Sequence, residues 1–292
     1  MKIGIVGAGA VGLLAGAYLG RHHEVHMIVR REEQRRMLTK NGIACDTLES
    51  PVPVKASRSL DEEVDLILLT VKQHHLPDVL DDGLPAGVPL LFLQNGMTHY
   101  RRASIDPRPC FTGIVEHGAR KENDCSVRHT GKGVMRIAPL TDEGFGVYRR
   151  LFEALAEEDF PIYLEARAET MLKKKLLVNA VINPVTAVFK VRNGKLLTNP
   201  YLCDIARKLC EEACDVLSLS FPDEWDRVCR IAEKTGSNHS SMLVDLMEGR
   251  QTEVDAISGY ILEEGTRPLP YHEFIVTAVR AIEWEEGGNT NE

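Results

Sequence analysis

The 292-residue chain lacks a basic excess and lacks any long hydrophobic run. Its formal net charge of −8 argues against a general binder of nucleic acid or of anionic membranes, because such proteins carry excess positive charge. No segment approaches the ~18 consecutive apolar residues of a membrane-spanning helix. The apolar N-terminus has the pattern of a strand and not of an export signal, so we expect a cytoplasmic protein. Any anion site is therefore expected to be a local basic pocket.

The chain also lacks a regular cysteine framework. Its seven cysteines are scattered and odd in number, which favours reduced thiols over disulfides. Cys210 and Cys214 lie four residues apart on a predicted helix and share one face. A metal pair there is one interpretation, but no histidine or third cysteine lies at ligand spacing. Buried small side chains are the favoured interpretation, and no metal site is predicted.

What the chain does have is a glycine-rich turn at its start, in the sequence MKIGIVGAGAVGLLAG. Residues 2–6 are apolar and β-branched, as in a buried strand, and residues 11–19 continue as an apolar helix. In the spacing G-x-G-x-x-G the first glycine allows the tight turn, the second lets the backbone approach a pyrophosphate, and the third lets helix and strand pack closely. The helix N-terminus attracts the phosphates. We predict a dinucleotide-binding turn formed by Gly7, Ala8, Gly9, Ala10, Val11 and Gly12; a turn that binds nothing is the alternative.

The end of the second predicted strand, residues 24–29, indicates which dinucleotide binds. NAD-binding proteins usually carry an acid there for the ribose 2′-hydroxyl. This chain has Arg30 and Arg31, with Arg35 and Arg36 one turn later. Guanidinium groups bind a 2′-phosphate through charge-assisted bonds, so the sequence favours NADP(H) over NAD(H). The alternative is that the arginines only cap an exposed loop.

The elements divide the chain into two predicted domains. Residues 1–165 alternate strands and helices, which predicts a Rossmann-type, doubly wound parallel sheet. Residues 166–292 show only helix-spaced apolar residues, which predicts an all-helical domain. Strands are expected at 2–6, 24–29, 64–70, 88–93, 111–115, 133–138 and 161–164, with helices at 11–19, 32–40 and 144–157. The second domain is expected to form helices at 171–190, 199–219, 224–234, 240–248, 252–264 and 271–285.

A polar stripe crosses the first helix of the second domain. Lys175, Asn179 and Asn183 are spaced i, i+4 and i+8, so they lie on one face of a helix that is otherwise strongly apolar. Burying a lysine and two amides costs free energy unless they serve a cavity. The stripe therefore predicts a binding site, and the alternative is that Lys175 is one more exposed lysine.

Two further segments carry candidate polar residues. Asn95 follows a buried strand at its carboxyl end, where it is placed to bond a nicotinamide ribose or a substrate; an ordinary Asn-Gly turn is the alternative. Ser241 and Glu253 would point ~120° apart on one ideal helix. Gly249 between them is expected to break the helix and allow both to reach one cleft. From spacing alone, Glu253 is predicted to be a surface residue.

Together these segments resemble the ketopantoate reductase (2-dehydropantoate 2-reductase) family. The resemblance implies a Rossmann domain, then a helical domain like the C-terminal part of 6-phosphogluconate dehydrogenase, with the active site in the cleft between them. The loop 107–109 and the chain after Gly265 fit the family pattern loosely. The matching segments are GAGAVG at 7–12, TVK at 70–72, LQNGM at 93–97, EHGA at 116–119, KLLVNAVINPVTA at 175–187, NG at 193–194, SSMLVD at 240–245 and TEVDAISGY at 252–260.

The resemblance also implies roles for single residues. Lys175 matches the proton donor, and Glu253 matches a glutamate near the reacting hydroxyl and the nicotinamide. Asn95 matches a position that contacts both cofactor and substrate, and Lys72 and Ala119 match cofactor positions. Substrate contacts are implied for Asn179, Asn183, Asn193 and Ser241.

The expected activity is the NADPH-dependent reduction of ketopantoate to (R)-pantoate, a step of pantothenate synthesis. Alternatives are a reductase of another small keto acid or imine, and a non-catalytic NADPH-binding regulator. We expect a small-molecule substrate and no nucleic-acid or membrane partner. The sequence leaves a homodimer open.

Overall fold

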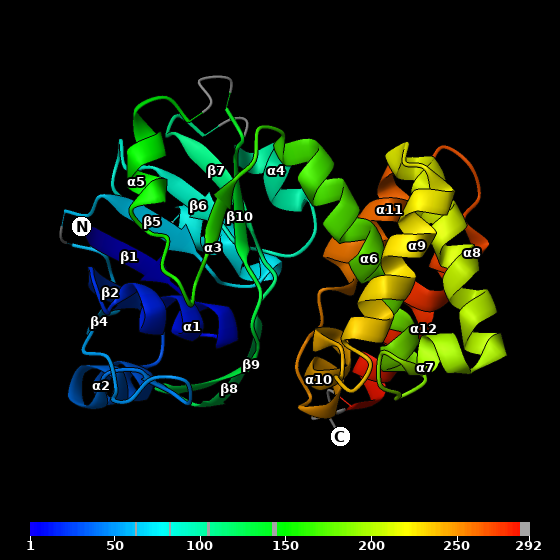
Figure 1. Cartoon of the computed structure of the whole chain (residues 1–292), viewed down its shortest axis with the longest axis horizontal. Coiled ribbons are helices and arrows are strands. Elements are labelled where there is room, and N and C mark those ends of the chain that lie inside the picture. The colour runs from blue at the N-terminus through cyan, green and yellow to red at the C-terminus, as the bar shows by residue number, and fades with distance from the viewer. Residues whose placement is uncertain (62, 82, 104–105, 142–144, 287–292) are drawn as a thin grey trace. The chain divides into compact units, whose positions relative to one another are not determined.

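The computed structural model describes residues 1–286 except 62, 82, 104–105 and 142–144. The chain forms two compact units, each with its own fold (Figure 1). An α/β unit contains Met1–Gln94 and His99–Met171, and a helical unit contains Asn95–Thr98 and Leu172–Glu292. The predicted fold class, an N-terminal α/β sheet domain followed by an all-helical domain, is confirmed.

The α/β unit is built on an eight-stranded sheet of order β11-β10-β7-β6-β5-β1-β2-β4. Neighbouring strands are parallel, except that β10 pairs antiparallel with β7. The predicted parallel arrangement is interrupted at this one pair, because a short hairpin, and not a crossover helix, links β7 to β10. The strands are β1 Lys2–Val6, β2 Glu24–Ile28, β4 Lys55–Ser57, β5 Leu66–Leu69, β6 Leu90–Phe92, β7 Cys110–Val115, β10 Met135–Pro139 and β11 Ile162–Leu164.

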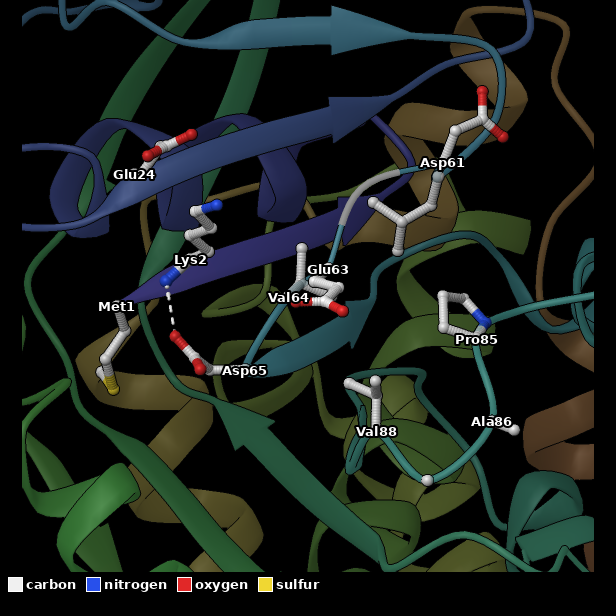
Figure 2. Close-up of a pocket in the computed structure, with 12 residues that line it drawn as sticks. Met1, Lys2, Glu24, Asp61, Glu63, Val64, Asp65, Pro85, Ala86 and Val88 are labelled. Atoms are coloured by element: carbon white, nitrogen blue, oxygen red, sulfur yellow. Dashed lines mark hydrogen bonds between the residues drawn. The ribbon is translucent and has the colours of Figure 1, made fainter.

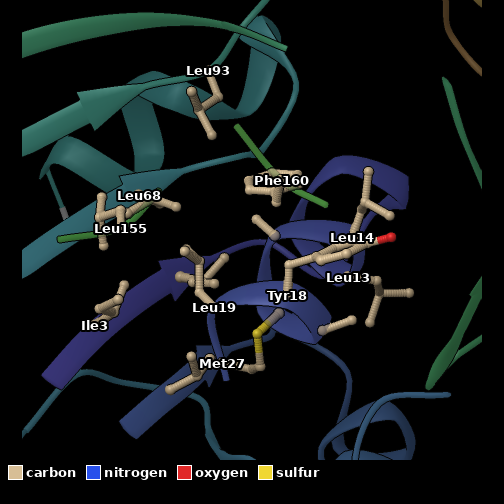
Figure 3. Close-up of a cluster of buried hydrophobic side chains, with 14 of the residues drawn as sticks. Ile3, Leu13, Leu14, Tyr18, Leu19, Met27, Leu68, Leu93, Leu155 and Phe160 are labelled. Carbon is tan, nitrogen blue, oxygen red and sulfur yellow. The ribbon is translucent and has the colours of Figure 1, made fainter. Parts of the chain in front are cut away.

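Helices cover both faces of this sheet, as a doubly wound fold requires. In β5, Leu66 and Leu68 pack in one apolar cluster while Ile67 and Leu69 pack in another, because alternate side chains of a strand point to opposite faces. The first cluster includes side chains of α1 (Ala10–Leu19), α2 (Glu32–Asn41) and α5 (Arg149–Glu153). Figure 3 draws part of it, including Leu13, Leu14 and Tyr18 of α1. The second includes side chains of α3 (Leu76–Asp81) and α4 (Thr98–Ala103).

A second, three-stranded sheet is absent from the sequence prediction. It consists of β3 Ala44–Cys45, β9 Ser126–Gly131 and β8 Gly118–Asn123, in that order. Strands β8 and β9 are polar and partly exposed, and β3 has only two residues, so none of them shows the apolar run that marked the strands of the main sheet. The predicted helix 144–157 is shorter than expected: a 3₁₀ turn at Gly146–Tyr148 leads into α5, and residue 144 lies outside the described residues.

In the helical unit, structure forms at each of the six predicted helical segments. The segment predicted at 252–264 begins as a π-helical turn, Asp255–Gly259. The short helix α7, Lys195–Thr198, was missed. The remaining helices are α6 Ala168–Val188, which begins in the α/β unit, α8 Pro200–Leu217, α9 Phe221–Lys234, α10 Ser241–Met247, α11 Tyr260–Glu264 and α12 Pro270–Glu286. Among the described residues, no helix combines the length and apolarity needed to cross a bilayer.

Candidate functional site

The glycine turn between β1 and α1 has the geometry that its sequence predicts. Gly7 adopts φ +104°, a conformation that side chains disfavour, and a Cβ there would lie 2.9 Å from a methyl carbon of Val71. A Cβ on Gly12 would lie 2.1 Å from the Gly7 carbonyl oxygen, which no side chain can accept. A Cβ on Gly9 would meet nothing within 4 Å, so the backbone there is open to a ligand.

Two side chains that the sequence prediction did not select support this turn, the half-buried Thr70 and the buried Gln94. The Thr70 hydroxyl donates to the carbonyl oxygens of Gly7, at 2.7 Å, and Val6, at 3.0 Å. The Gln94 amide donates to the carbonyl oxygens of Leu69, at 2.9 Å, and Val71, at 3.1 Å. Both residues stand in segments quoted above, TVK and LQNGM, beside the residues that were selected. The prediction missed them because their side chains bond to backbone carbonyl oxygens, and no sequence pattern identifies such bonds.

The two arginines after β2 have different partners. The Arg30 guanidinium lies 3.1 Å from His75 Nε2, an atom that carries no negative charge. Burial, followed by the charge of Arg30, holds the pKa of His75 below its ordinary value. Arg31 instead forms an ion pair with Asp124, from the turn between β8 and β9. The strand end itself carries no acid, but the fold brings Asp124 to it.

The other two arginines of this segment share one carboxylate on their own helix. Arg35 and Arg36 both bond the carboxylate of Glu32, one turn earlier on α2. The hydrogen bond from Arg35 is the largest influence on Glu32 and helps to lower the pKa of its carboxyl to about 2. Arg30 and Arg31 are therefore the better candidates for an anionic ligand.

These residues fit a dinucleotide. The α1 N-terminus directs backbone N–H groups at the open side of the turn, where a pyrophosphate is bound in folds of this kind. Arg30 and Arg31 would hold a 2′-phosphate, and Lys72 follows β5 at the same edge of the sheet, where it precedes the 3₁₀ turn Gln73–His75. Ala119 lies on β8 and packs against the core. Contacts of Lys72 and Ala119 with a cofactor stay predictions.

A pocket lies at the opposite edge of the sheet. It is lined by the first residues of β1 and β2 and by the segments that precede β5 and β6 (Figure 2). Its carboxylates, from Glu24, Asp61, Glu63 and Asp65, would repel phosphates. The backbone N–H of Lys2 donates to Asp65 at 2.7 Å. Ligands of doubly wound sheets bind at the carboxyl ends of the strands, so we do not place the cofactor in this pocket.

In the helical unit, three predicted residues meet through their side chains. Asn179 of α6 donates to the Asn95 oxygen at 3.3 Å, and the Asn95 amide donates to Glu253 Oε2 at 2.9 Å. Gly96 makes this approach possible, because it adopts φ +85° and a Cβ there would lie 2.3 Å from the Ala256 carbonyl oxygen. Asn95 is thus more than an ordinary turn residue.

Glu253 corrects an expectation from spacing. It is half-buried and not a surface residue, and it accepts the hydrogen bond from Asn95. The predicted helix break is confirmed: α10 ends at Met247, and Gly249 adopts φ +61° before the chain turns toward the π-helical segment. Because of this break, Glu253 does not lie on a continuation of α10.

The polar stripe on α6 extends one position beyond the predicted residues. Lys175 is half-buried and Asn183 is buried, and the next position on the same face is the fully buried Thr186. The Thr186 hydroxyl lies 2.7 Å from the hydroxyl of Ser240. Ser240 accepts from the backbone of Leu243 and caps α10. Thr186 and Ser240 were missed because a threonine in an apolar helix and a serine before one are common structural residues.

The other two predicted substrate contacts, Asn193 and Ser241, have different surroundings. Ser241 is exposed and is the first helical residue of α10. Asn193 is buried, and its amide donates to the Thr235 hydroxyl at 2.9 Å, while its side-chain oxygen is buried without a hydrogen bond. The substrate contacts of Asn193 and Ser241 stay predictions.

The cysteines of α8 are buried, as the favoured interpretation has it. Cys210 and Cys214 are 0% and 3% exposed, and both are free thiols. A hydrogen bond with Cys214, followed by burial, raises the pKa of the Cys210 thiol. Within the described ranges, no group of three or more histidine, cysteine or acidic side chains is arranged to hold a metal ion.

A glycine-turn α/β unit followed by a helical unit with a Lys–Asn–Asn stripe defines a class of two-domain, nicotinamide-dependent oxidoreductases. Comparison with known proteins identifies the group within that class. Residues 3–142 match the family Ketopantoate reductase PanE/ApbA, and residues 167–283 match Ketopantoate reductase PanE/ApbA C terminal. The chain belongs to this family and is an oxidoreductase of it.

Similar proteins cover nearly the whole chain. The 2-dehydropantoate 2-reductase of Bacillus subtilis is 39% identical over 97% of this chain and 98% of its own, and that of Listeria monocytogenes is 34% identical over 98% of both. A crystal structure of the probable Bacillus subtilis enzyme superposes with a TM-score of 0.85 at 37% identity, over 97% of this chain and all of the other.

More distant structures share the fold. D-mandelate dehydrogenase with NADH and anilino(oxo)acetate has a TM-score of 0.90 at 24% identity, over 98% of this chain and 99% of the other. A ketopantoate reductase of Staphylococcus aureus, described as dimeric, has a TM-score of 0.80 at 23% identity, over 98% and 100%. The same fold therefore carries different substrates.

Proposed function

We propose that this protein reduces 2-dehydropantoate to (R)-pantoate with NADPH. The observation that carries the proposal is the hydrogen-bonded chain Asn179–Asn95–Glu253, which begins at Asn179 on the face of α6 that also bears Lys175. A cation, two amides and a carboxylate are the groups that a 2-keto acid with a neighbouring hydroxyl requires. Family membership and the identity to curated 2-dehydropantoate 2-reductases support the choice of substrate.

The proposed mechanism assigns the proton to Lys175. When bound, the nicotinamide supplies hydride to the C2 ketone. Negative charge then develops on the ketone oxygen, where an ammonium group stabilises it and donates a proton to it. Lys175 is half-buried on an apolar helix, so the surroundings screen its charge less than water would.

Amides and hydroxyls would hold the substrate carboxylate and orient the ketone. Asn179, Asn183, Asn193 and Ser241 are the proposed contacts. Glu253 would accept a hydrogen bond from a substrate hydroxyl, or keep Lys175 in its charged form. Asn95 fixes the orientation of the Glu253 carboxylate through the 2.9 Å hydrogen bond. Arg30 and Arg31 would hold the 2′-phosphate, which makes NADPH the proposed cofactor.

The first test is NADPH oxidation with 2-dehydropantoate, compared between the wild type and Lys175→Ala. We expect kcat to fall by about 10²–10⁴-fold, the usual contribution of a general acid, while the dissociation constant of NADPH stays unchanged. Lys174→Ala is the matched control, because it removes the same charge from the adjacent position on another face of α6. It should retain wild-type kcat.

The outcomes separate the alternatives. Turnover of another 2-keto acid in preference to 2-dehydropantoate would replace the substrate but keep the chemistry. Tight NADPH binding without turnover of any keto acid would indicate a non-catalytic regulator. A homodimer stays a prediction, which light scattering of the purified protein would test.

A further inference from the structure

The turn between β8 and β9 places a carboxylate beside the proposed 2′-phosphate site. Asp124 forms an ion pair with Arg31, the residue that precedes α2, and its Oδ1 atom lies 3.0 Å from Lys121 Nζ. Two cations thus converge on one carboxylate oxygen. The Asp124 side chain is only 15% exposed, so solvent screens this arrangement incompletely.

The hairpin that carries Asp124 is anchored at both ends. At the turn, the Gln34 amide donates to the carbonyl oxygens of Asp124 and of Ala8, both at 3.0 Å, and so ties the turn to the glycine loop. Further along β9, His129 lies 2.8 Å from the Tyr18 hydroxyl of α1 through its Nδ1 atom. Asp124 is therefore held in place against the cofactor loop by contacts from α1 and α2.

This placement has a known chemical counterpart. In NAD-binding proteins, an acid at the end of the second strand accepts a hydrogen bond from the ribose 2′-hydroxyl and repels a 2′-phosphate. Here the strand end carries Arg30 and Arg31, and a carboxylate reaches the same place from 93 residues further along the chain. The contact with Arg31 engages one of its five N–H donors, so others stay available to an anion.

We propose that Asp124 sets how strongly the enzyme discriminates NADPH from NADH, because its carboxylate competes with the 2′-phosphate for Arg31 and Lys121. The proposal rests on the proposed NADP(H) site. Competition weakens NADPH binding without abolishing it, since the hydrogen bond that Arg30 forms within the described part of the chain goes to a His75 ring nitrogen and not to a carboxylate. NADH has no 2′-phosphate, so its binding does not meet this competition, and the amide oxygen of the Asp124→Asn variant can still accept a hydrogen bond from a ribose 2′-hydroxyl.

Asp124→Asn tests the proposal, because it removes the charge and keeps the size and turn propensity of the side chain. We expect the dissociation constant of NADPH to fall about three- to tenfold at low ionic strength, as partly exposed charges give, while that of NADH changes by less than about twofold. The fluorescence of bound NADPH and NADH measures both constants without substrate. Unchanged NADH binding also shows that the variant is folded.

Glu122→Gln is the matched control. Glu122 lies on the same hairpin, but its carboxylate pairs with Arg128 and not with Arg31. It should leave both constants unchanged. In the Arg31→Gln background, Asp124→Asn should give little further gain in NADPH affinity. The guanidinium for which the carboxylate and the 2′-phosphate compete is then absent.

Other results would overturn the proposal. NADPH binding that weakens in Asp124→Asn would mean that the carboxylate only orients Arg31, and unchanged binding would mean that the pair is irrelevant. An equal gain in NADPH affinity in Glu122→Gln would show that the effect comes from the net charge of the hairpin and not from the Asp124–Arg31 pair. Arg30→Gln and Arg31→Gln report on the cofactor assignment itself: if neither weakens NADPH binding, the NADP(H) site is wrong, whatever Asp124 does.

Discussion

At the scale of single residues, the three glycines of the turn differ in what they would tolerate. Gly12 has no room, because a Cβ would lie 2.1 Å from the Gly7 carbonyl oxygen, whereas Gly9 has open space. We therefore expect Gly12→Ala to lower the free energy of unfolding by roughly 1–3 kcal/mol, the usual cost of overpacking, and to weaken NADPH binding. Thermal unfolding without cofactor and an NADPH titration measure the two effects.

Gly9→Ala separates ligand contact from folding. It should leave the unfolding temperature of the free protein near that of the wild type, because the added methyl group meets nothing. It should still weaken NADPH binding, because that open space is where a pyrophosphate approaches the backbone. Wild-type NADPH affinity in Gly9→Ala would show that the phosphates lie elsewhere.

Sequence reasoning found the residues of the site better than it found their partners. The stripe of α6 follows from helical spacing, so Lys175, Asn179 and Asn183 were predictable. The bond of Asn95 to Glu253 joins residues 158 positions apart, and spacing alone placed Glu253 at the surface. Such contacts arise from the tertiary fold, which local periodicity does not contain.

At the scale of elements, two adjacent serines at the start of α10 have separable roles. Ser240 is buried, caps the helix by accepting from Leu243, and contacts Thr186. We expect Ser240→Ala to lower the free energy of unfolding by about 1–2 kcal/mol, because both a cap and a buried hydrogen bond are lost. Urea unfolding followed by tryptophan fluorescence suits this measurement, because Trp225 and Trp284 both belong to the helical unit.

Ser241→Ala is the companion variant. Ser241 is exposed, so its loss should change stability by less than about 0.5 kcal/mol. By its proposed contact with the substrate carboxylate, the variant should raise KM for 2-dehydropantoate. A normal KM in Ser241→Ala would remove this residue from the site, and a stability loss equal to that of Ser240→Ala would contradict the division of roles.

The elements that were predicted and those that were missed differ in one physical property. Strands such as β5, with the sequence LILL, are buried on both faces and stand out as apolar runs. Strands β8 and β9, GARKEN and SVRHTG, are partly exposed and carry charges, so their pairing leaves little trace in composition. That hairpin nevertheless delivers Asp124 to Arg31, so the missed element bears on cofactor choice.

At the scale of the whole molecule, the α/β unit contains buried histidines that resist protonation. His99 is 1% exposed, stacks on Phe92, and bonds Gln73 and Thr112 through its two ring nitrogens. Burial lowers its pKa from 6.5 to about 4. Burial, with the charge of His129, also lowers the pKa of His117 to about 4.

These lowered pKa values predict an acid-sensitive α/β unit. Between pH 6.5 and 4 the unfolded chain binds protons that the folded His99 excludes, so the unfolded state gains stability as the pH falls. At full effect His99 lowers the free energy of unfolding by about 3 kcal/mol.

Urea unfolding followed by far-UV circular dichroism at several pH values should show the free energy of unfolding falling across this window. His99→Asn should flatten that dependence although it lowers stability at neutral pH, and the part that is left comes from His117 and from other histidines of lowered pKa, such as His75. His239→Asn, at an exposed site of the helical unit, should leave the pH dependence unchanged. An equally steep dependence in His99→Asn would show that other groups govern the acid response.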